Sequence, residues 1–179
     1  MSSNGLTPSK VREIMNTKVL VLRPEQTVGE ASQIFNDNNI SGAPVVDAAD
    51  RLVGIITETD ILKAIKPFEK RLSMVYPSLS IMSITFKPQY KERELALTLE
   101  EIQKIRVEEV MTRDIYVVGP EDSIQKAVLI MNGMGINRLP VVEGTKVAGI
   151  LTRGDIIRFL AQGGIGPVSE SVPKRPKSG

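Results

Sequence analysis

The sequence predicts an α+β protein made of two copies of one β-α-β-β-α unit, packed about a pseudo-two-fold axis. One observation behind this prediction is a repeated motif, in which glycine and two apolar residues lead into Thr-x-x-Asp, at residues 54–60 and 149–155. The pattern is typical of a buried strand that runs directly into the N-terminus of a helix. A second observation is that the segments around the motif are repeated as well, and an internal repeat decides architecture before local patterns do.

The two copies align over most of their length. Met15 of the first copy matches Met111 of the second, 96 positions later, and both copies contain the tripeptide Pro-Val-Val at the same spacing. The spacing falls to 95 in the predicted turn after this tripeptide, where a deletion is tolerated best. We therefore expect two equivalent domains, at residues 11–66 and 107–162.

Each domain is expected to contain three short, continuously apolar strands, which is typical of strands that helices cover. These strands are residues 19–22, 43–46 and 52–56 in the first copy, and residues 115–118, 139–142 and 146–151 in the second. Pro24 limits the first of them, since proline cannot donate a hydrogen bond to a neighbouring strand.

Two amphipathic helices are expected to accompany the strands of each domain. The first helix of each copy begins at an N-cap residue, Thr27 in a capping box and Ser123 at the equivalent place. The second helices are predicted at residues 58–66 and 153–162. A short helical turn over residues 11–15 precedes the first strand.

The segment between the domains, residues 67–106, is expected to be ordered and packed on them, because a structureless loop of that length is rare in a compact protein. Its first part, residues 73–86, is apolar and uncharged. Thr98 and Glu101 fit a further capping box. Apolar residues at helical spacing predict a helix over residues 91–105; they are Leu95, Leu99, Ile102 and Ile105.

Neither domain is expected to be stable alone, because about 55–60 residues bury too little apolar surface to offset the entropy of the chain. The sheets of the two copies are expected to pack together, so that any crevice between the copies is formed twice. The termini, residues 1–10 and 163–179, are expected to be flexible.

Residue composition argues against catalysis. The chain contains no cysteine and no histidine, which removes thiolate chemistry, the commonest general base and the commonest metal ligand. No metal site is expected. An enzyme built from this chain would depend on a carboxylate such as Asp60 or Asp155, and we expect the protein not to be an enzyme.

Charge and hydropathy indicate which partners to expect. The net charge of +2 arises in the tail beyond residue 162, and the preceding chain is balanced, so no nucleic-acid partner is expected. No apolar run reaches the roughly 20 residues that span a bilayer, and no signal peptide is recognisable. We therefore expect a cytoplasmic protein without a membrane partner.

The repeated Thr-x-x-Asp motif has two interpretations. Threonine and aspartate are oxygen acceptors at a helix start, so the motif is accounted for by two helix caps. A helix N-terminus also carries spare N–H groups and a positive dipole, and these favour an anionic ligand. The occurrence of two copies in matched surroundings favours a binding site.

The combined pattern resembles the cystathionine-β-synthase (CBS) domain, and two such domains in tandem resemble a Bateman module. The resemblance is carried by Met-x-x-x before an apolar strand, Pro-x-x-[Ser/Thr] before a helix, Ile-x-x-x-Pro-Val-Val-[Asp/Glu], and Gly-Ile-[Ile/Leu]-Thr-x-x-Asp. It implies that an adenosine-containing ligand lies in the crevice between the two domains.

The resemblance also implies roles for particular residues. Asp60 and Asp155 match the carboxylate that holds the ribose hydroxyls, and Thr57 and Thr152 match the hydroxyl that contacts ribose or phosphate. The adenine is expected beside the first strand and the loop before Pro-Val-Val. These positions are Thr17, Lys18, Val19, Ser41, Gly42, Ala43 and Pro44 in the first copy, and Asp114, Ile115, Tyr116, Asn137, Arg138, Leu139 and Pro140 in the second.

The two implied sites are not chemically equal. Arg138 lies two residues before the second Pro-Val-Val, where the resemblance implies a phosphate-binding cation, and its counterpart is Gly42. Arg153 stands within the second motif, where the first has Glu58. A ligand that carries phosphate is therefore expected to favour the site built on Asp155.

The function that this resemblance implies is a regulatory module that senses AMP, ADP, ATP or S-adenosylmethionine, with no further cofactor. A homodimer and an effector protein of unknown identity are the expected partners. The alternative is a scaffold of the same fold that binds no ligand and serves dimerisation or a partner protein.

Overall fold

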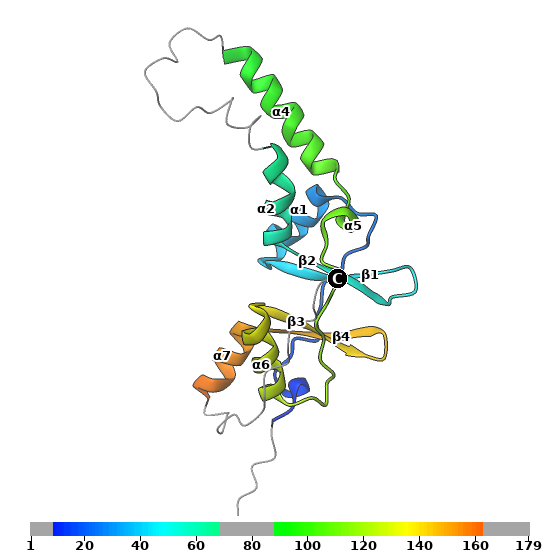
Figure 1. The fold of residues 1–179 in the computed structure, drawn as a ribbon, viewed down its shortest axis with the longest axis vertical. Helices are drawn as coiled ribbons and strands as arrows, with labels where there is room; N and C mark the ends of the chain where they lie inside the picture. Colours follow the sequence, from blue (N-terminus) through cyan, green and yellow to red (C-terminus); the bar gives the residue numbers. More distant parts are fainter. Residues whose placement is uncertain (1–8, 69–87, 163–179) are drawn as a thin grey trace, which may run out of the picture. The chain divides into compact units, whose positions relative to one another are not determined.

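The structure, a computed structural model, describes residues 9–68 and 88–162. These residues fall into two units, which we name after the repeat that supplies each sheet (Figure 1). The repeat-one unit contains residues 21–48, 53–68 and 88–113, and the repeat-two unit contains residues 9–20, 49–52 and 114–162.

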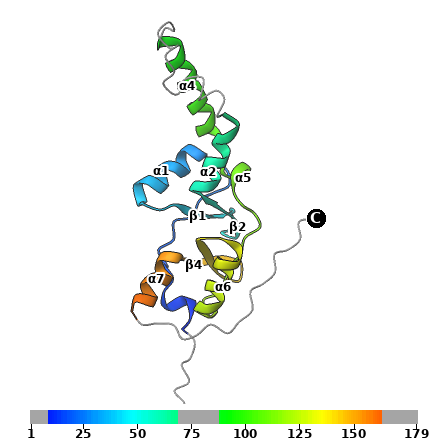
Figure 2. The same ribbon diagram turned by 60° about the vertical axis from the view of Figure 1, so that its left-hand side comes forward.

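The sheet of the repeat-one unit consists of two neighbouring strands, β1 (Gly42–Val46) and β2 (Leu52–Thr57). Two helices cover one face of this sheet, α1 (Val28–Asn38) and α2 (Glu58–Ile65), as Figures 1 and 2 show. The chain continues beyond α2 in a 3-10 turn, η2 (Lys66–Phe68).

The repeat-two unit has the same arrangement. Strands β3 (Arg138–Glu143) and β4 (Lys146–Thr152) pair antiparallel, and the helices α6 (Ile124–Met134) and α7 (Arg153–Ala161) cover one face. A 3-10 turn from the start of the chain, η1 (Val11–Glu13), belongs to this unit. The predicted α+β tandem repeat is confirmed.

The prediction of a first strand in each copy, at residues 19–22 and 115–118, is wrong. Each is reduced to one residue in a parallel bridge, Leu22 with Val45 and Val118 with Val141. The next rung of a parallel ladder would need the N–H group two residues further on, and that residue is proline in both copies. The ladder therefore ends after one bridge.

The predicted helix starts are confirmed. Thr27 Oγ1 accepts from the N–H of Glu30 at 3.2 Å, while the Thr27 N–H donates to the Glu30 carboxylate at 2.7 Å. Ser123 Oγ accepts from the N–H of Lys126 at 3.2 Å. Each cap satisfies an N–H group that has no partner within the helix.

The leading segment of each repeat, residues 9–20 and 107–113, belongs to the unit of the other repeat. Val11, at the start of repeat one, is fully buried in the repeat-two core, and Val107 and Met111, at the start of repeat two, lie in the repeat-one core. The repeat-one core consists of Leu22, Ala31, Phe35, Ala43, Val45, Ile56, Val107 and Met111. The repeat-two core consists of Val11, Val118, Ala127, Ile130, Met131, Met134, Leu139, Val141, Leu151 and Ile156.

The helix predicted between the domains is confirmed as α4 (Pro88–Lys104), which is followed by α5 (Val107–Val110). The capping box predicted at Thr98 is wrong, because Thr98 is a buried residue inside α4 and the helix begins ten residues earlier. Proline suits that first position, where its missing N–H costs nothing.

The stripe predicted on this helix is confirmed in part. Ile102 is buried, whereas Leu99 is 45% exposed. The C-terminal end of α4 packs on α1, where a Cβ on Gly29 would lie 3.1 Å from Gln103 Cβ, and the rest of α4 extends beyond α1 and α2 in both ribbon views. The apolar stretch over residues 73–86 lies outside the described residues.

Candidate functional site

In both repeats the Thr-x-x-Asp motif joins the last strand directly to the last helix. Thr57 ends β2 and is the N-cap of α2, and Thr152 ends β4 and is the N-cap of α7. The apolar residues before each threonine are buried in the sheet, which fixes the position of the helix start.

The aspartate of each motif caps its helix through one carboxylate oxygen. Asp60 Oδ2 accepts from the N–H of Thr57 at 2.9 Å and from its hydroxyl at 2.6 Å. Asp155 Oδ2 accepts from the N–H of Thr152 at 2.8 Å and from its hydroxyl at 2.6 Å. The capping interpretation of the motif is therefore confirmed, and it accounts for one oxygen of each carboxylate.

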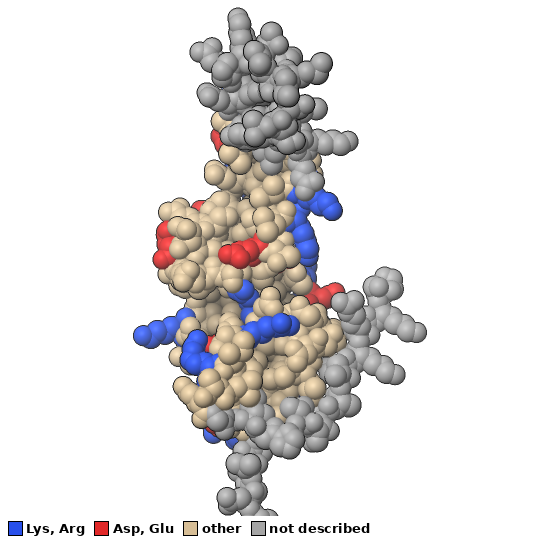
Figure 3. All heavy atoms as spheres, turned by 90° about the vertical axis from the view of Figure 1, so that its left-hand side faces the viewer, with Lys and Arg blue, Asp and Glu red and all other residues tan. Residues whose placement is uncertain are grey.

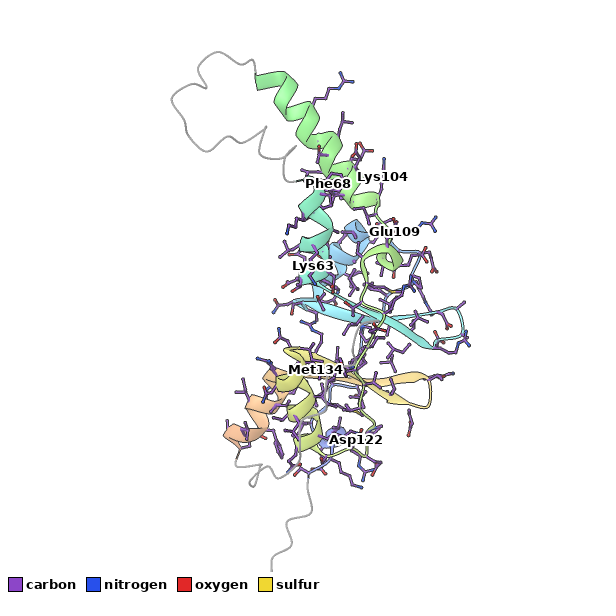
Figure 4. The ribbon with its side chains drawn as sticks, in the orientation of Figure 1. Lys63, Phe68, Lys104, Glu109, Asp122 and Met134 are labelled. Atoms are coloured by element: carbon purple, nitrogen blue, oxygen red, sulfur yellow. The ribbon has the colours of Figure 1, made fainter. Side chains whose placement is uncertain are left out.

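The second oxygen of each carboxylate has different neighbours in the two units. Asp60 Oδ1 accepts from the hydroxyl of Thr112 at 3.4 Å and lies 4.0 Å from the ammonium group of Lys63. Asp155 Oδ1 lies 3.4 Å from the guanidinium group of Arg158. Both cations sit one helical turn after their aspartate and are largely exposed. Lys63 is labelled on α2 in Figure 4.

Sequence reasoning missed Thr112. It belongs to the leading segment of the second repeat, yet it lies in the repeat-one unit beside Asp60, because its backbone pairs with Ile55 of β2 in an antiparallel bridge. The sequence did contain a signal for it. The repeat aligns Met111 with Met15, and this alignment makes Thr112 the counterpart of Asn16.

The loop before β1 is held against the start of α2. The carbonyl of Ser41 accepts from the N–H of Glu58 at 3.2 Å, and Gly42, Ala43 and Pro44 follow as buried residues of β1. These four residues of the expected adenine site therefore lie in the same unit as Thr57 and Asp60.

The equivalent loop of repeat two is held in the same way. The carbonyl of Asn137 accepts from the N–H of Arg153 at 3.0 Å, and the Arg153 side chain donates to the carbonyl of Ile136 at 3.2 Å. Arg138 is paired with Thr152 in the register of β3 and β4, and Leu139 and Pro140 are buried behind it. The backbone pairing brings Arg138 and Arg153 to the same end of the sheet as Asp155.

The adenine-site residues expected at the first strands all lie in the repeat-two unit. Thr17, Lys18 and Val19 were expected beside the adenine together with the loop of repeat one, whose residues belong to the other unit, and their role in binding stays a prediction. The preceding residue, Asn16, forms an antiparallel bridge with Ile150 of β4, and this bridge carries the segment into the other unit. The other expected residues, Asp114, Ile115 and Tyr116, lie in the same unit, and Tyr116 packs against its core.

A pocket of about 540 Å³ lies between α1 and α2 of the repeat-one unit. It is apolar where Phe35, Ile40, Ile61 and Leu62 line it, and polar where it meets asparagine, serine and glutamate side chains. Of the expected site residues it includes Ser41.

Three further kinds of feature bear on the choice of site: patches of charge, metal-ligand clusters and membrane-spanning helices. Figure 3 shows lysine and arginine side chains in small groups, with acidic side chains near some of them. Over residues 9–68 and 88–162, no cluster of three or more potential protein ligands is placed to hold a metal ion. No helix in this described part of the chain is long and apolar enough to cross a bilayer.

Two matched sheet-and-helix units, each with a Thr-x-x-Asp helix start, define a tandem α+β repeat module. The family model described as "CBS domain" matches residues 11–67 and 107–162, which is more than half of the chain. The chain therefore belongs to the CBS domain family, and the resemblance seen in the sequence is confirmed.

Relatives and solved structures agree with this assignment. The chain is 36% identical over 152 residues to the uncharacterized protein MJ1426 of Methanocaldococcus jannaschii, covering 84% of this chain and 90% of that protein. It is similar to the solved CBS domain pair of protein MJ0100 in complex with 5′-methylthioadenosine and S-adenosyl-L-methionine, with a TM-score of 0.61, 26% identity, and coverage of 85% of this chain and 99% of that one.

A third match is the crystal structure of CBSX2 in complex with AMP. Its TM-score is 0.62 at 24% identity, with coverage of 86% of this chain and 96% of that one. At this identity the likeness shows that the two proteins share a fold.

Proposed function

We propose that this chain is a regulatory module that binds an adenosine-containing ligand through the Thr-x-x-Asp motifs of its two repeats. The candidate ligands are AMP, ADP, ATP and S-adenosylmethionine. The observation that carries the proposal is that only one oxygen of Asp60 and of Asp155 is used to cap a helix. The second oxygen is an acceptor suited to the hydroxyl groups of a ribose, and such charge-assisted hydrogen bonds are strong.

The cations of the repeat-two unit support a ligand that carries phosphate. Arg138 and Arg153 stand at the end of the sheet where α7 begins, and Lys18 belongs to the same unit. The forked guanidinium group of arginine matches the geometry of a phosphate. The N-terminus of α7 adds a partial positive charge.

The solved CBS domain pairs support the adenosine part of the proposal. The MJ0100 pair is in complex with 5′-methylthioadenosine and S-adenosyl-L-methionine, and CBSX2 is in complex with AMP. These ligands share an adenosine group and differ at its 5′ position. The shared group is the one that a ribose-binding carboxylate recognises.

Calorimetry with AMP, ADP, ATP and S-adenosylmethionine tests the proposal. At least one of them should bind with Kd below roughly 100 μM, which corresponds to about −5.5 kcal/mol. The protein should first be freed of carried-over ligand, and mass spectrometry of the released small molecules identifies any such ligand directly. If none of the four ligands binds to the folded protein, the proposal is contradicted.

A second candidate function is a ligand-free scaffold, because helix capping alone accounts for one oxygen of each aspartate. On this hypothesis the module acts by dimerisation or by holding an effector protein. A thermal-shift screen separates the two functions, since a ligand that binds only the native state must raise the midpoint of unfolding. We also propose a cytoplasmic homodimer without catalytic activity, and light scattering of the purified protein tests the dimer.

A further inference from the structure

We propose that Thr112 makes Asp60 the weaker of the two ribose-binding carboxylates, by holding the oxygen that a ribose would need. This inference rests on the proposed function. It assigns Thr112 as a positioning residue that sets which motif binds first. Asn16 is its counterpart in the other unit, and its side chain bonds to the N–H of Lys18 instead of to Asp155.

The backbones at Thr112 and Asn16 are held in the same way. The Thr112 N–H donates to the carbonyl of Ile55 at 2.9 Å, and the Ile55 N–H donates back at 3.0 Å. Asn16 exchanges the same two hydrogen bonds with Ile150, both at 2.9 Å. Ile55 and Ile150 each stand two residues before the motif threonine, so both side chains start from equivalent places.

The two side chains nevertheless bond to different groups. The Thr112 hydroxyl donates to Asp60 Oδ1 at 3.4 Å. Asn16 instead turns back on its own segment, where its Oδ1 accepts from the N–H of Lys18 at 2.9 Å. At this position the two units therefore differ in the side chain alone.

The donors that already occupy each carboxylate decide the effect on a ligand. An ionised carboxylate offers about four lone-pair positions. Asp60 uses two of them for the Thr57 N–H and hydroxyl and a third for Thr112, which leaves one for a ribose that presents two neighbouring hydroxyl groups. Asp155 uses two for Thr152 and a third for the guanidinium group of Arg158, which donates to Oδ1 at 3.4 Å. The two carboxylates therefore differ in the kind of third donor, a part-buried hydroxyl group at Asp60 and an exposed cation at Asp155.

The third donors differ in how easily a ligand displaces them. Arg158 is 71% exposed where it donates to Asp155, and its counterpart Lys63, which is 73% exposed, lies 4.0 Å from Asp60 Oδ1. Ion pairs of such exposed side chains are weak and are released at little cost. Thr112 differs from them because its backbone position is set by β2.

Calorimetry on a set of single-site variants tests the inference, with AMP, ADP, ATP and S-adenosylmethionine as probes. Asp155→Ala leaves the Asp60 site, and adding Thr112→Val to this background should tighten binding about 3–10-fold, the factor expected for one hydrogen bond. Adding Thr112→Ser keeps the hydroxyl and should keep the weak binding. In the opposite background, Asp60→Ala with Asn16→Thr should weaken binding by a similar factor.

Each outcome decides the matter. Tighter binding with valine that serine does not reproduce supports the inference. Unchanged or weaker binding with valine overturns it while leaving the proposed function intact. Absence of binding by the parent protein overturns the proposed function and this inference together. If the Asp155→Ala background does not fold, crystals of the full-length parent and of Thr112→Val soaked at limiting AMP replace it. The occupancy at Asp60 should then rise in the variant, and equal occupancies overturn the inference.

Discussion

At the scale of single residues, each motif aspartate combines a structural role with a proposed binding role. One oxygen stabilises the helix start, and the other is the proposed ribose acceptor. A substitution at Asp155 therefore has to be measured on both properties, stability and binding.

Asp155→Ala should lower stability and abolish binding at its site. The lost cap is expected to cost about 0.5–2 kcal/mol, because the N–H and hydroxyl of Thr152 lose their acceptor. Urea unfolding measures the first effect and calorimetry with AMP the second.

The matched control for this variant is Asp122→Ala. Asp122 accepts from the N–H of Gly119 at 2.8 Å just before α6, so its loss should cost stability without changing binding. If Asp155→Ala also lost only stability and bound ligand as tightly as the parent, Asp155 would be a helix cap and nothing more.

Gly149, at the start of the second motif, has no room for a side chain, because the leading segment of repeat one lies close to its backbone. A Cβ on Gly149 would lie 2.7 Å from Met15 Sδ and 3.1 Å from the carbonyl oxygen of Asn16. Gly149→Ala should therefore destabilise the protein by about 1–3 kcal/mol, as overpacking does.

Gly154→Ala is the control for that prediction. A Cβ there would lie 3.6 Å from the nearest atom, Thr152 Oγ1, which is an ordinary contact, and alanine favours a helix by up to about 1 kcal/mol. Thermal unfolding compares the two variants. Equal midpoints for both would show that Met15 moves aside without cost.

At the scale of elements, the turn before α6 holds both the leading segment and the helix. Lys10 and Arg12 form ion pairs with Glu121, and the hydrogen bond from Lys10 lowers the pKa of the Glu121 carboxyl. Asp122, labelled in Figure 4, lies at the same turn and bonds to Lys126 at 2.8 Å. Partial burial raises the pKa of Asp122, but the Lys126 hydrogen bond and the Gly119 N–H outweigh it and lower the pKa.

Asp122→Asn should lower stability in a pH-dependent manner. A carboxyl whose pKa is lower in the folded state stabilises the protein above its unfolded pKa, and this contribution is lost as pH falls through the folded pKa. The difference in free energy of unfolding between parent and variant should be greatest near pH 6. It should shrink as the pH falls below 3.8, the ordinary pKa of an aspartate carboxyl. Urea unfolding at several pH values measures it.

Lys126→Met provides the control for this titration. Removing the ammonium group takes away one cause of the lowered pKa, so Asp122→Asn should cost less in that background. If the difference in free energy of unfolding between parent and Asp122→Asn stayed constant from pH 6 to pH 3, the lowered pKa of Asp122 would not be its cause.

At the scale of the whole molecule, the exchange of leading segments makes each repeat incomplete. Repeat two lacks the fully buried Val11 unless residues 9–20 are present, and repeat one lacks Val107. A buried valine contributes about 1.5–3 kcal/mol, a large share of the stability of so small a domain.

A fragment of residues 107–162 alone is therefore expected not to unfold cooperatively. A second fragment, in which a flexible Gly/Ser linker joins residues 9–20 to residues 114–162, should unfold cooperatively because it contains the complete repeat-two core. Circular dichroism during urea titration compares them. Equal stability of the two fragments would show that the leading segment is dispensable.

The two sites are predicted to fill in order, Asp155 before Asp60, when the ligand carries phosphate. Repeat two has Arg153 where repeat one has Glu58, and a charge ~7 Å from a phosphate contributes on the order of 1 kcal/mol at an effective dielectric near 40. A crystal soak at limiting AMP, with refined occupancies, measures the order. Equal occupancy, or a preference for Asp60, would show that these substitutions do not set it.

Much of the local structure was predictable from the sequence, because short-range chemistry determines it. The repeat spacing identified two equivalent units, and Thr-x-x-Asp predicted both helix starts, since capping joins residues only three apart. The same motifs identified Asp60 and Asp155, whose proposed binding roles stay predictions. The resemblance to the CBS domain followed from these repeated local patterns.

Tertiary structure alone decided which distant segments meet. The predicted first strands became single bridges at Leu22 and Val118, and Thr98 became an internal residue of α4. The leading segments joined the opposite units, and this exchange placed Thr112 beside Asp60. A local pattern specifies strand and helix, but pairing partners depend on burial and hydrogen bonds between residues far apart in the chain, which no short window of sequence contains.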